Sequence, residues 1–190
     1  MHRPLMILGA VCLISACGPK APEDAKNTNA PPDGNPSATI PTPANEAAAV
    51  DFVPKAAASD AFELEAAKIA TAKSSNPAIK DFAAMMTDTH TKSSAALSAA
   101  LSISGLPITV PHDLPKDLQE KLDNLNKTDA KDFDRMYIEG QEDAHQSALD
   151  LLSRYANDGD NQALKSFATA QISTVQAHLD SAKSLKDKLK

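Results

Sequence analysis

The sequence has few of the residues on which many well-known functional sites depend. Its 190 residues include no Trp, two Cys, six Gly, five Phe and two Tyr. Two Cys are too few for a zinc-ribbon cage or a framework of several disulfides. The scarce Gly forms no phosphate-binding loop of the Walker or dinucleotide type. These absences exclude several common classes of enzyme and binding module.

Positive charge is also in short supply. Lys and Arg number 19 against 25 Asp and Glu, which gives a formal net charge of −6. A protein that coats nucleic acid needs a clustered excess of Lys and Arg to neutralise phosphates. We therefore predict no nucleic-acid partner.

The first residues have the pattern of an export signal. Arg3 provides a short basic start, and the apolar run 5–14 that follows is too short to span a bilayer. The run ends in Ile14-Ser15-Ala16-Cys17, which resembles the bacterial lipobox, where the Cys becomes the lipid-bearing first residue of the mature chain. We predict a signal peptide over 1–16 and a lipid on Cys17. The alternative is an ordinary secretory signal with an incidental Cys.

Gly18 bears on the destination of the exported chain. In lipoproteins of this kind an Asp after the lipidated Cys tends to retain the protein at the inner membrane, so Gly18 favours the outer membrane. We expect a bacterial envelope protein that is anchored to the membrane through Cys17 and faces the periplasm. Cys12 leaves with the signal and Cys17 carries the lipid, so the mature chain has no free thiol.

Residues 17–49 differ in composition from the rest of the chain. The segment lacks aromatic residues and contains seven of the 13 Pro: Pro19, Pro22, Pro31, Pro32, Pro36, Pro41 and Pro43. It offers little apolar surface whose burial could offset the entropy lost on ordering. We predict a disordered tether with a reach of about 30 Å.

Residues 50–190 show helical periodicity nearly throughout and form the predicted folded domain. Helices are expected over 50–74, 77–104, 129–157 and 161–190, with a short extra helix over 116–126 in the connector 105–128. In the first helix the inward stripe is expected to contain Ala58, Phe62, Glu65, Ile69 and Ala72. No segment alternates as a strand does. The prediction is an all-α, ferritin-like four-helix bundle.

Two of these helices begin with similar segments. Asn76-Pro-Ala-Ile-Lys-Asp-Phe-Ala is echoed by Asn161-Gln-Ala-Leu-Lys-Ser-Phe-Ala. Asn is a favoured N-cap, so convergence on a good helix start explains the echo. A duplicated helical hairpin explains it equally well.

Three His in mid-helix are the main chemical clue. Counting residues from the turns, at 1.5 Å per residue, places two of them in one layer of the bundle with two acidic residues, and the third about a turn away. Glu142 precedes one of them by three residues, a spacing that carboxylate-bridged metal bundles use. The candidate metal ligands are Glu63, Glu65, His90, Glu142, His145 and His178, and imidazole with carboxylate suits Fe, Zn, Cu or Mn. The alternative is a buried layer of His–Glu hydrogen bonds that fixes the helix register.

The same residues argue against most catalytic sites. A di-metal carboxylate site uses two Glu-x-x-His pairs, whereas this sequence has one. No Ser-His-Asp or Cys-His set can be assembled. Binding is therefore favoured over catalysis, and a metal-dependent oxidoreductase such as a ferroxidase is a third alternative.

Several segments together resemble a known bacterial family. Asp60-Ala-Phe-Glu-Leu-Glu, Met86-Thr-Asp-Thr-His-Thr-Lys and Lys131-Asp-Phe-Asp-Arg-Met-Tyr resemble the bacterial domain of unknown function 4142, often labelled a predicted outer membrane protein. The resemblance covers about 51–187 and implies a ferritin-like fold without an established activity. The family's recurring positions correspond to Glu63, Glu65, Asp88, His90, Phe133, Asp134, Tyr137, His145 and His178.

Two functions are favoured over the oxidoreductase. The first is a lipid-anchored envelope protein whose helical domain binds a transition metal and serves stress tolerance. The second is a metal-free structural or interaction module with a protein partner in the envelope.

Overall fold

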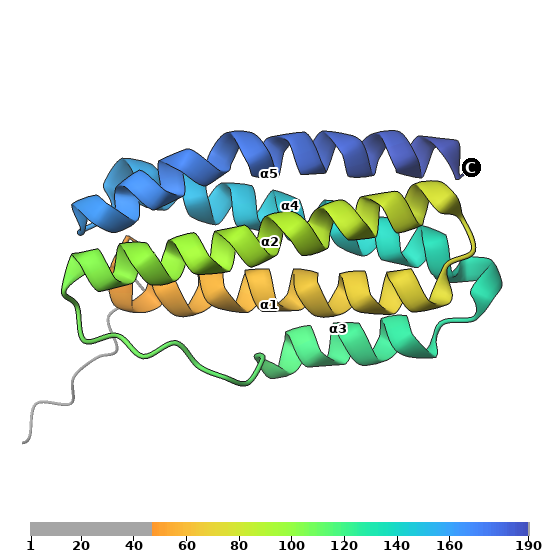
Figure 1. The fold of residues 1–190 in the computed structure, drawn as a ribbon, viewed down its shortest axis with the longest axis horizontal. Coiled ribbons are helices and arrows are strands. Elements are labelled where there is room, and N and C mark those ends of the chain that lie inside the picture. The colour runs from red at the N-terminus through yellow and green to blue at the C-terminus, as the bar shows by residue number, and fades with distance from the viewer. Residues whose placement is uncertain (1–46, 190) are drawn as a thin grey trace, which may run out of the picture. The chain divides into compact units, whose positions relative to one another are not determined.

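The computed structural model describes residues 47–189, which form five α-helices and, within that range, no strand. The helices are α1 (Ala49–Lys73), α2 (Pro77–Ser104), α3 (Lys116–Lys127), α4 (Ala130–Asp158) and α5 (Gln162–Lys188) (Figure 1). The predicted all-α fold is confirmed, and the predicted helix boundaries lie close to the observed ones. The predicted signal peptide 1–16, Cys17 and most of the predicted tether 17–49 lie outside the described residues.

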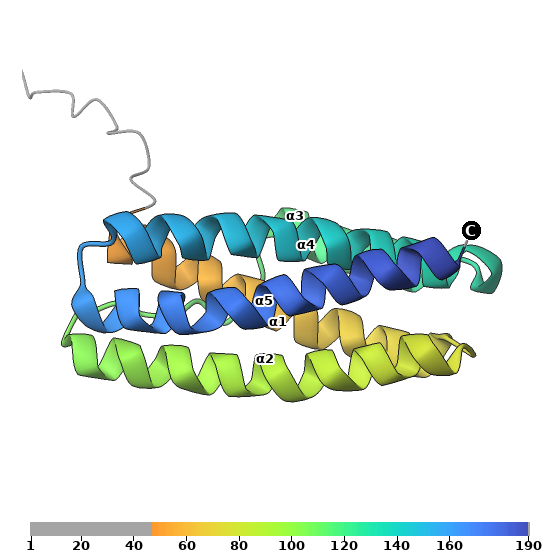
Figure 2. The ribbon, with the colours of Figure 1, turned by 90° about the horizontal axis from the view of Figure 1, so that it is seen from above.

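The four long helices form a bundle in which α1 and α5 lie diagonally opposite. Helices α1 and α2 pair as one antiparallel hairpin and α4 and α5 as another, and further contacts join α2 to α5 and α1 to α4 (Figures 1 and 2). The connector that contains α3 carries the chain back along the outside of α1, so that α2 and α4 run parallel (Figure 1). A single long crossover of this kind is characteristic of ferritin-like bundles.

Local signals account for the helix ends. The Asn76 side chain accepts a hydrogen bond from the Ala78 N–H at 3.0 Å, with Pro77 at the first helical position. Asn161 caps α5 in the same way, because its side chain accepts from Ala163 at 3.0 Å. The two echoed segments therefore share one capping arrangement.

The interior consists of two apolar clusters along the length of the bundle. One contains Phe62, Ile79, Phe82, Met86, Phe133 and Tyr137, and the other contains Phe52, Leu97, Leu152, Tyr155, Phe167 and Val175. Along their helices, His90, His145 and His178 each fall between residues of the first cluster and residues of the second. A buried polar layer therefore separates two apolar halves of the core.

Asp160 closes the end of the bundle where α1 begins. Its Oδ1 accepts hydrogen bonds from the Ala49 N–H at 3.0 Å and from the Tyr155 hydroxyl at 2.9 Å. The Tyr155 ring stacks on Phe52, with ring centroids 3.9 Å apart. Gly159 passes so close to Tyr155 that a Cβ at this position would lie 2.5 Å from the Tyr155 carbonyl oxygen. This turn therefore fixes where α5 starts relative to α1.

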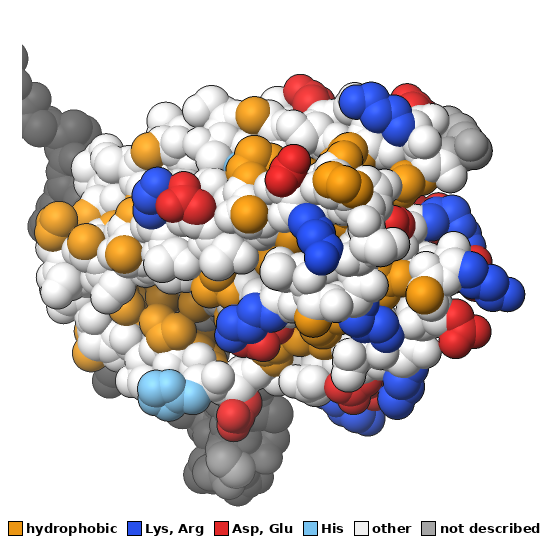
Figure 3. Space-filling model, turned by 45° about the vertical axis from the view of Figure 1, so that its right-hand side comes forward, with side chains coloured by type: hydrophobic (Ala, Val, Ile, Leu, Met, Phe, Trp, Pro, Cys, Tyr) orange, Lys and Arg blue, Asp and Glu red, His pale blue; other side chains and the backbone are white. Residues whose placement is uncertain are grey.

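The surface seen in Figure 3 carries charged side chains of both signs interspersed with small groups of apolar ones. Among the described helices, none is long and apolar enough to cross a membrane.

Candidate metal centre

His90, His145 and His178 meet inside the bundle, although they come from three different helices. Their ring centroids lie 5.3 to 5.7 Å apart, and one ring nitrogen of each lies within 4.8 Å of the corresponding nitrogens of the other two. All three are buried, with His145 only 1% exposed. Their separations leave space for a shared ligand at the centre of the three rings.

Two of these rings are held from behind by hydrogen bonds at Nδ1. His90 Nδ1 donates to Asp60 Oδ1 at 2.8 Å, and the other Asp60 oxygen accepts from the Ser94 hydroxyl at 3.4 Å. His145 Nδ1 lies 2.7 Å from the Gln141 carbonyl oxygen and must donate to it, because a carbonyl only accepts. Since a neutral imidazole carries one proton, the Nε2 of each of these two rings is left with a free lone pair.

Each of the three rings also has one nitrogen without a partner. Within residues 47–189, His90 Nε2, His145 Nε2 and His178 Nδ1 are buried and have no hydrogen-bond partner. Leaving a buried polar atom unsatisfied costs roughly 1–3 kcal/mol, and native proteins rarely gather three such atoms in one place. The geometry brings three ring nitrogens together, and two of them, His90 Nε2 and His145 Nε2, carry free lone pairs.

Burial keeps two of the rings neutral. The pKa of His145 is lowered to about 4, mainly by desolvation. The hydrogen bond to the Gln141 backbone acts to raise this pKa, and the nearby His90 and His178 act to lower it. Desolvation and the proximity of His90 lower the pKa of His178 to about 4 as well. At neutral pH both rings are therefore uncharged, and each keeps one N–H and one lone pair, which in His145 lies at Nε2.

Glu63 lies behind the cluster. It is 1% exposed, and its Oε1 is 3.7 Å from His145 Nδ1, the nitrogen on the side of the ring opposite the unpartnered Nε2. Desolvation raises the pKa of the Glu63 carboxyl to about 7, although His90 and a hydrogen bond from the Gln141 side chain act to lower it. Glu63 is thus placed to adjust the charge around His145 rather than to join the three nitrogens.

The structure does not bring Glu65 or Glu142 to the cluster. Glu65 is exposed and pairs with Lys68 at 2.5 Å, and Glu142 pairs with Lys186 of α5 at 2.7 Å. The prediction that Glu65 lies on the inward stripe of α1 was wrong: Glu63 faces the core, and Glu65, two residues further along the helix, points about 200° away from it. The stripe predicted through Ala58, Glu65 and Ala72 is replaced by one through Phe52, Ala56, Asp60, Glu63, Ala67 and Ala70.

The predicted offset of His178 was also wrong. The prediction counted residues from Gly159 to His178 as if all of them were helical, although residues 159–161 form a turn before α5 begins. Measured from the helix ends, His145 is 13 residues from Asp158 and His178 is 16 from Gln162. The difference of three residues is about 4.5 Å, which the side chains can bridge.

Asp60 is a participant that the sequence analysis did not single out. Asp60 is 6% exposed, and it lies on the same face of α1 as Glu63, which follows it by three residues. This spacing of two acidic residues is the feature of the sequence that could have indicated that Asp60 is buried. Gln141 is 1% exposed and could have been found in the same way, because it precedes His145 by about one helical turn and so lies on the same face of α4.

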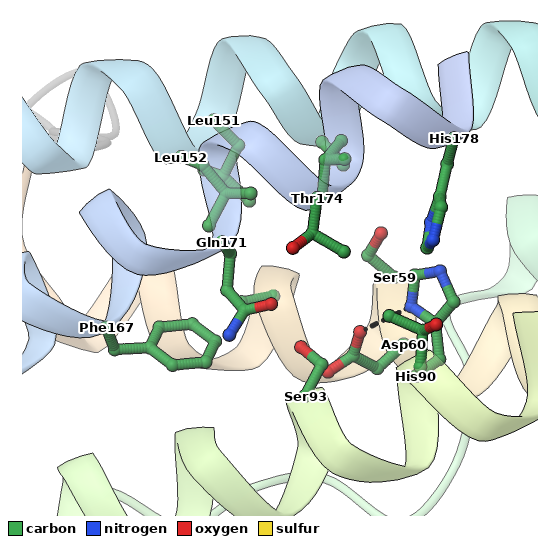
Figure 4. Close-up of a pocket in the computed structure, with 14 residues that line it drawn as sticks. Ser59, Asp60, His90, Ser93, Leu151, Leu152, Phe167, Gln171, Thr174 and His178 are labelled. Atoms are coloured by element: carbon green, nitrogen blue, oxygen red, sulfur yellow. Dashed lines mark hydrogen bonds and ion pairs between the residues drawn. The ribbon is translucent and has the colours of Figure 1, made fainter. Parts of the chain in front are cut away.

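A small cavity adjoins the cluster. His90 and His178 lie at one end of it and Phe167 and Leu152 at the other, with Asp60 and Ser93 on one side and Thr174 on the opposite side (Figure 4). Its volume is about 30 Å³. A cavity needs a volume of roughly 10–15 Å³ to hold one water, so about two waters fit in this cavity.

Comparison with known proteins identifies the family and the fold. The family profile described as "Domain of unknown function (DUF4142)" matches residues 34–185. A crystal structure of a DUF305 fragment from Deinococcus radiodurans is similar in fold, with a TM-score of 0.63 and 15% identity, over 77% of this chain and 97% of that one. No curated protein sequence matches the chain.

Proposed function

Because the chain belongs to the DUF4142 family, a domain of unknown function, its role must come from its own residues, and we propose that His90, His145 and His178 bind a single transition-metal ion. The observation that carries the proposal is the convergence of three buried His, which offer ring nitrogens within 4.8 Å of one another and each of which has one ring nitrogen without a partner. An ion placed between them would satisfy all three at once.

The hydrogen bonds at Nδ1 of His90 and His145 also support a metal site. Metal-bound His side chains commonly donate their second ring nitrogen to a carboxylate or to a backbone carbonyl, which fixes the ring orientation and makes the ligand more basic. Asp60 does this for His90, and the Gln141 carbonyl does it for His145. A purely structural layer would need no unpartnered nitrogens on the opposite sides of the rings.

The donor set narrows the choice of ion. Imidazole suits Zn, Cu, Fe and Ni, whereas Mn prefers carboxylate and water oxygens. Since neither Glu65 nor Glu142 joins the cluster, the nitrogen-only set favours Zn or Cu over Fe and Mn. Three His and one open position are the arrangement of zinc sites that bind an external ligand.

A direct titration tests the proposal. The full chain, prepared without a histidine tag, is stripped with chelator and titrated with Zn, Cu, Fe and Mn under calorimetry. We expect one tight site per chain, and a loss of affinity of more than about 100-fold in His145→Ala, since loss of a supporting residue alone costs 10–100-fold. His112→Ala is the matched control, because His112 is exposed and lies in the connector. Equal binding by both variants contradicts the proposal.

The alternative function is a metal-free structural or interaction module of the envelope. The 2.8 Å contact between His90 and Asp60 favours it, because such a bond also fixes helix register. The two functions differ in their response to metal. A structural module unfolds at the same temperature with and without each ion, whereas a metal-binding domain is stabilised by ligand binding to the folded state.

The cellular setting is part of the proposal. A lipid on Cys17 would hold the domain at the outer membrane, facing the periplasm, where it would meet metal ions as they enter the envelope. Labelled palmitate should enter the wild-type protein and not Cys17→Ala, and the wild-type protein should fractionate with the outer membrane. Recovery of both proteins in the soluble periplasmic fraction contradicts the anchor and leaves the metal site untouched.

A further inference from the structure

The cavity beside the three His is a second feature that metal binding alone does not explain. Resting on the proposed metal site, we infer that the cavity between α1, α2, α4 and α5 delivers a small external ligand, two or three atoms long, to the open coordination position of the bound ion. The ligand exchanges with a coordinated water, so that one bond from metal to water breaks and one from metal to ligand forms.

The position of the cavity supports this inference. Three protein nitrogens leave at least one position open on a four-coordinate ion. Two of the three His, His90 and His178, line the cavity, so the space lies next to two of the three donor residues (Figure 4). A ligand in this space would therefore lie beside the ion.

Size and lining determine the class of ligand. The volume of about 30 Å³, enough for about two waters, fits a diatomic or a linear triatomic molecule better than a ring such as imidazole. Phe167 and Leu152 give the far end an apolar wall, which disfavours multiply charged ions such as phosphate (Figure 4).

The charge around the bound ion also disfavours multiply charged ligands. A divalent ion on three neutral imidazoles, with the Asp60 carboxylate behind His90 and the Glu63 carboxyl behind His145, leaves a local charge between about 0 and +1. That charge is compatible with one monoanion or with a neutral molecule. Azide, a linear monoanion of three atoms, is therefore a suitable probe.

Thr174 provides a way to block the cavity. It is half-buried and lies on the side of the cavity opposite Asp60 (Figure 4). Thr174→Leu adds bulk comparable to the small free space. Thr169→Leu is the matched control, because it makes the same exchange on the exposed face of α5, outside the residues that line the cavity.

The experiment uses the full chain loaded with Co(II), whose visible spectrum reports its ligands. Cobalt uptake is measured first in wild type, Thr174→Leu and Thr169→Leu, and each is then titrated with azide and with imidazole. We expect azide to shift the spectrum of wild type and of Thr169→Leu saturably, and imidazole at the same concentrations to have no effect. Thr174→Leu should bind azide about tenfold more weakly, because its larger side chain occupies the space of the ligand, while its cobalt affinity changes less than about threefold.

The possible results separate the two proposals. Failure of wild type to take up cobalt overturns the metal site and the inference that rests on it. Normal cobalt uptake with no response to azide, or with equal responses to azide and imidazole, overturns the inference alone. Equal azide affinity in folded Thr174→Leu and wild type also overturns it. The comparison of azide with imidazole needs no variant, so it decides the matter even if Thr174→Leu does not fold.

Discussion

Asp60 and His90 are 30 residues apart in the sequence, and the Asp60 carboxylate accepts the His90 Nδ1 proton at 2.8 Å in the interior of the bundle. The pair crosses from α1 to α2, and both side chains are less than a tenth exposed. This bond selects the tautomer of His90 in which Nε2 faces His145 and His178 without a proton. Asp60 therefore shapes the donor set, although it supplies no donor itself.

Asp60→Asn should weaken zinc binding by about 10–100-fold, the usual effect of altering a residue that orients a ligand. Asn keeps the size of the side chain and removes the charge that makes the imidazole more basic. Competitive titration of the full chain against a chromophoric zinc chelator measures the effect. Asp88→Asn is the control, because Asp88 is exposed and pairs with Lys92 on the surface of α2. A loss of less than twofold in Asp60→Asn would mean that Asp60 has no part in the site.

Glu63→Gln should stabilise the metal-free protein at high pH. Burial raises the Glu63 pKa from 4.5 to about 7, so the folded state keeps a proton that the unfolded state has released between these values. Wild-type stability therefore falls as pH rises from 4.5 to 7, and the full penalty is present above pH 7. The amide does not ionise, so the variant should gain up to about 3 kcal/mol in free energy of unfolding at pH 8 and close to none at pH 4.5.

Denaturant unfolding in the presence of chelator, at pH values from 4.5 to 8, measures this difference. Glu65→Gln provides the matched control, because the Glu65 side chain is 49% exposed. Its stability relative to wild type should change little over the same range. A constant difference between Glu63→Gln and wild type at every pH would show that Glu63 ionises normally in the folded protein.

The sequence predicted the helices and the three His, because both depend on local patterns. Asn76-Pro77 is a strong helix start, and His90 falls on the same stripe as Met86 and Leu97, so its burial follows from periodicity. The large side chains of α2 define its inward face clearly. For this part of the domain, local rules were sufficient.

The sequence did not predict the rotation of α1 or the depth of α5. Helix α1 is rich in Ala on every side, so its apolar pattern does not distinguish the face of Glu63 from that of Glu65. That choice is made by packing against α2 and α4. The depth of His178 depends on how the turn 159–161 is built, which residue counting does not capture.

Gly159→Ala tests that turn. A Cβ at residue 159 would lie 2.5 Å from the Tyr155 carbonyl oxygen and 2.7 Å from its ring, in a turn that Asp160 ties to Ala49. The backbone would have to move, at an expected cost of about 1–3 kcal/mol in the free energy of unfolding. Urea unfolding monitored by circular dichroism measures this cost. Gly140→Ala is the control, since a Cβ at that position in α4 would have no atom within 4 Å apart from the backbone of its own helix and its chain neighbours, and Ala favours helix. Equal stability of the two variants would contradict the close contact at Tyr155.

His178→Leu should separate stability from metal binding. The substitution removes a buried nitrogen, Nδ1, that has no hydrogen-bond partner within the described residues, and it places an apolar side chain between the two halves of the core. The metal-free variant should therefore be as stable as wild type or more stable by up to about 1 kcal/mol. It also loses one of the three donors, so zinc should no longer stabilise it. Wild type, by contrast, should gain about 2.7 kcal/mol when zinc is present at 100 times its dissociation constant.

Thermal melts of wild type, His178→Leu and the control His112→Leu, each with chelator and with zinc, give both quantities. His112→Leu should respond to zinc as wild type does, because His112 is exposed in the connector. A metal-free His178→Leu that is less stable than wild type by more than about 1 kcal/mol would show that His178 contributes a hydrogen bond to the fold. Equal zinc stabilisation of His178→Leu and wild type would place the ion elsewhere. Greater stability without metal and no response to zinc is the pattern expected if the fold gives up stability to hold three free nitrogens together.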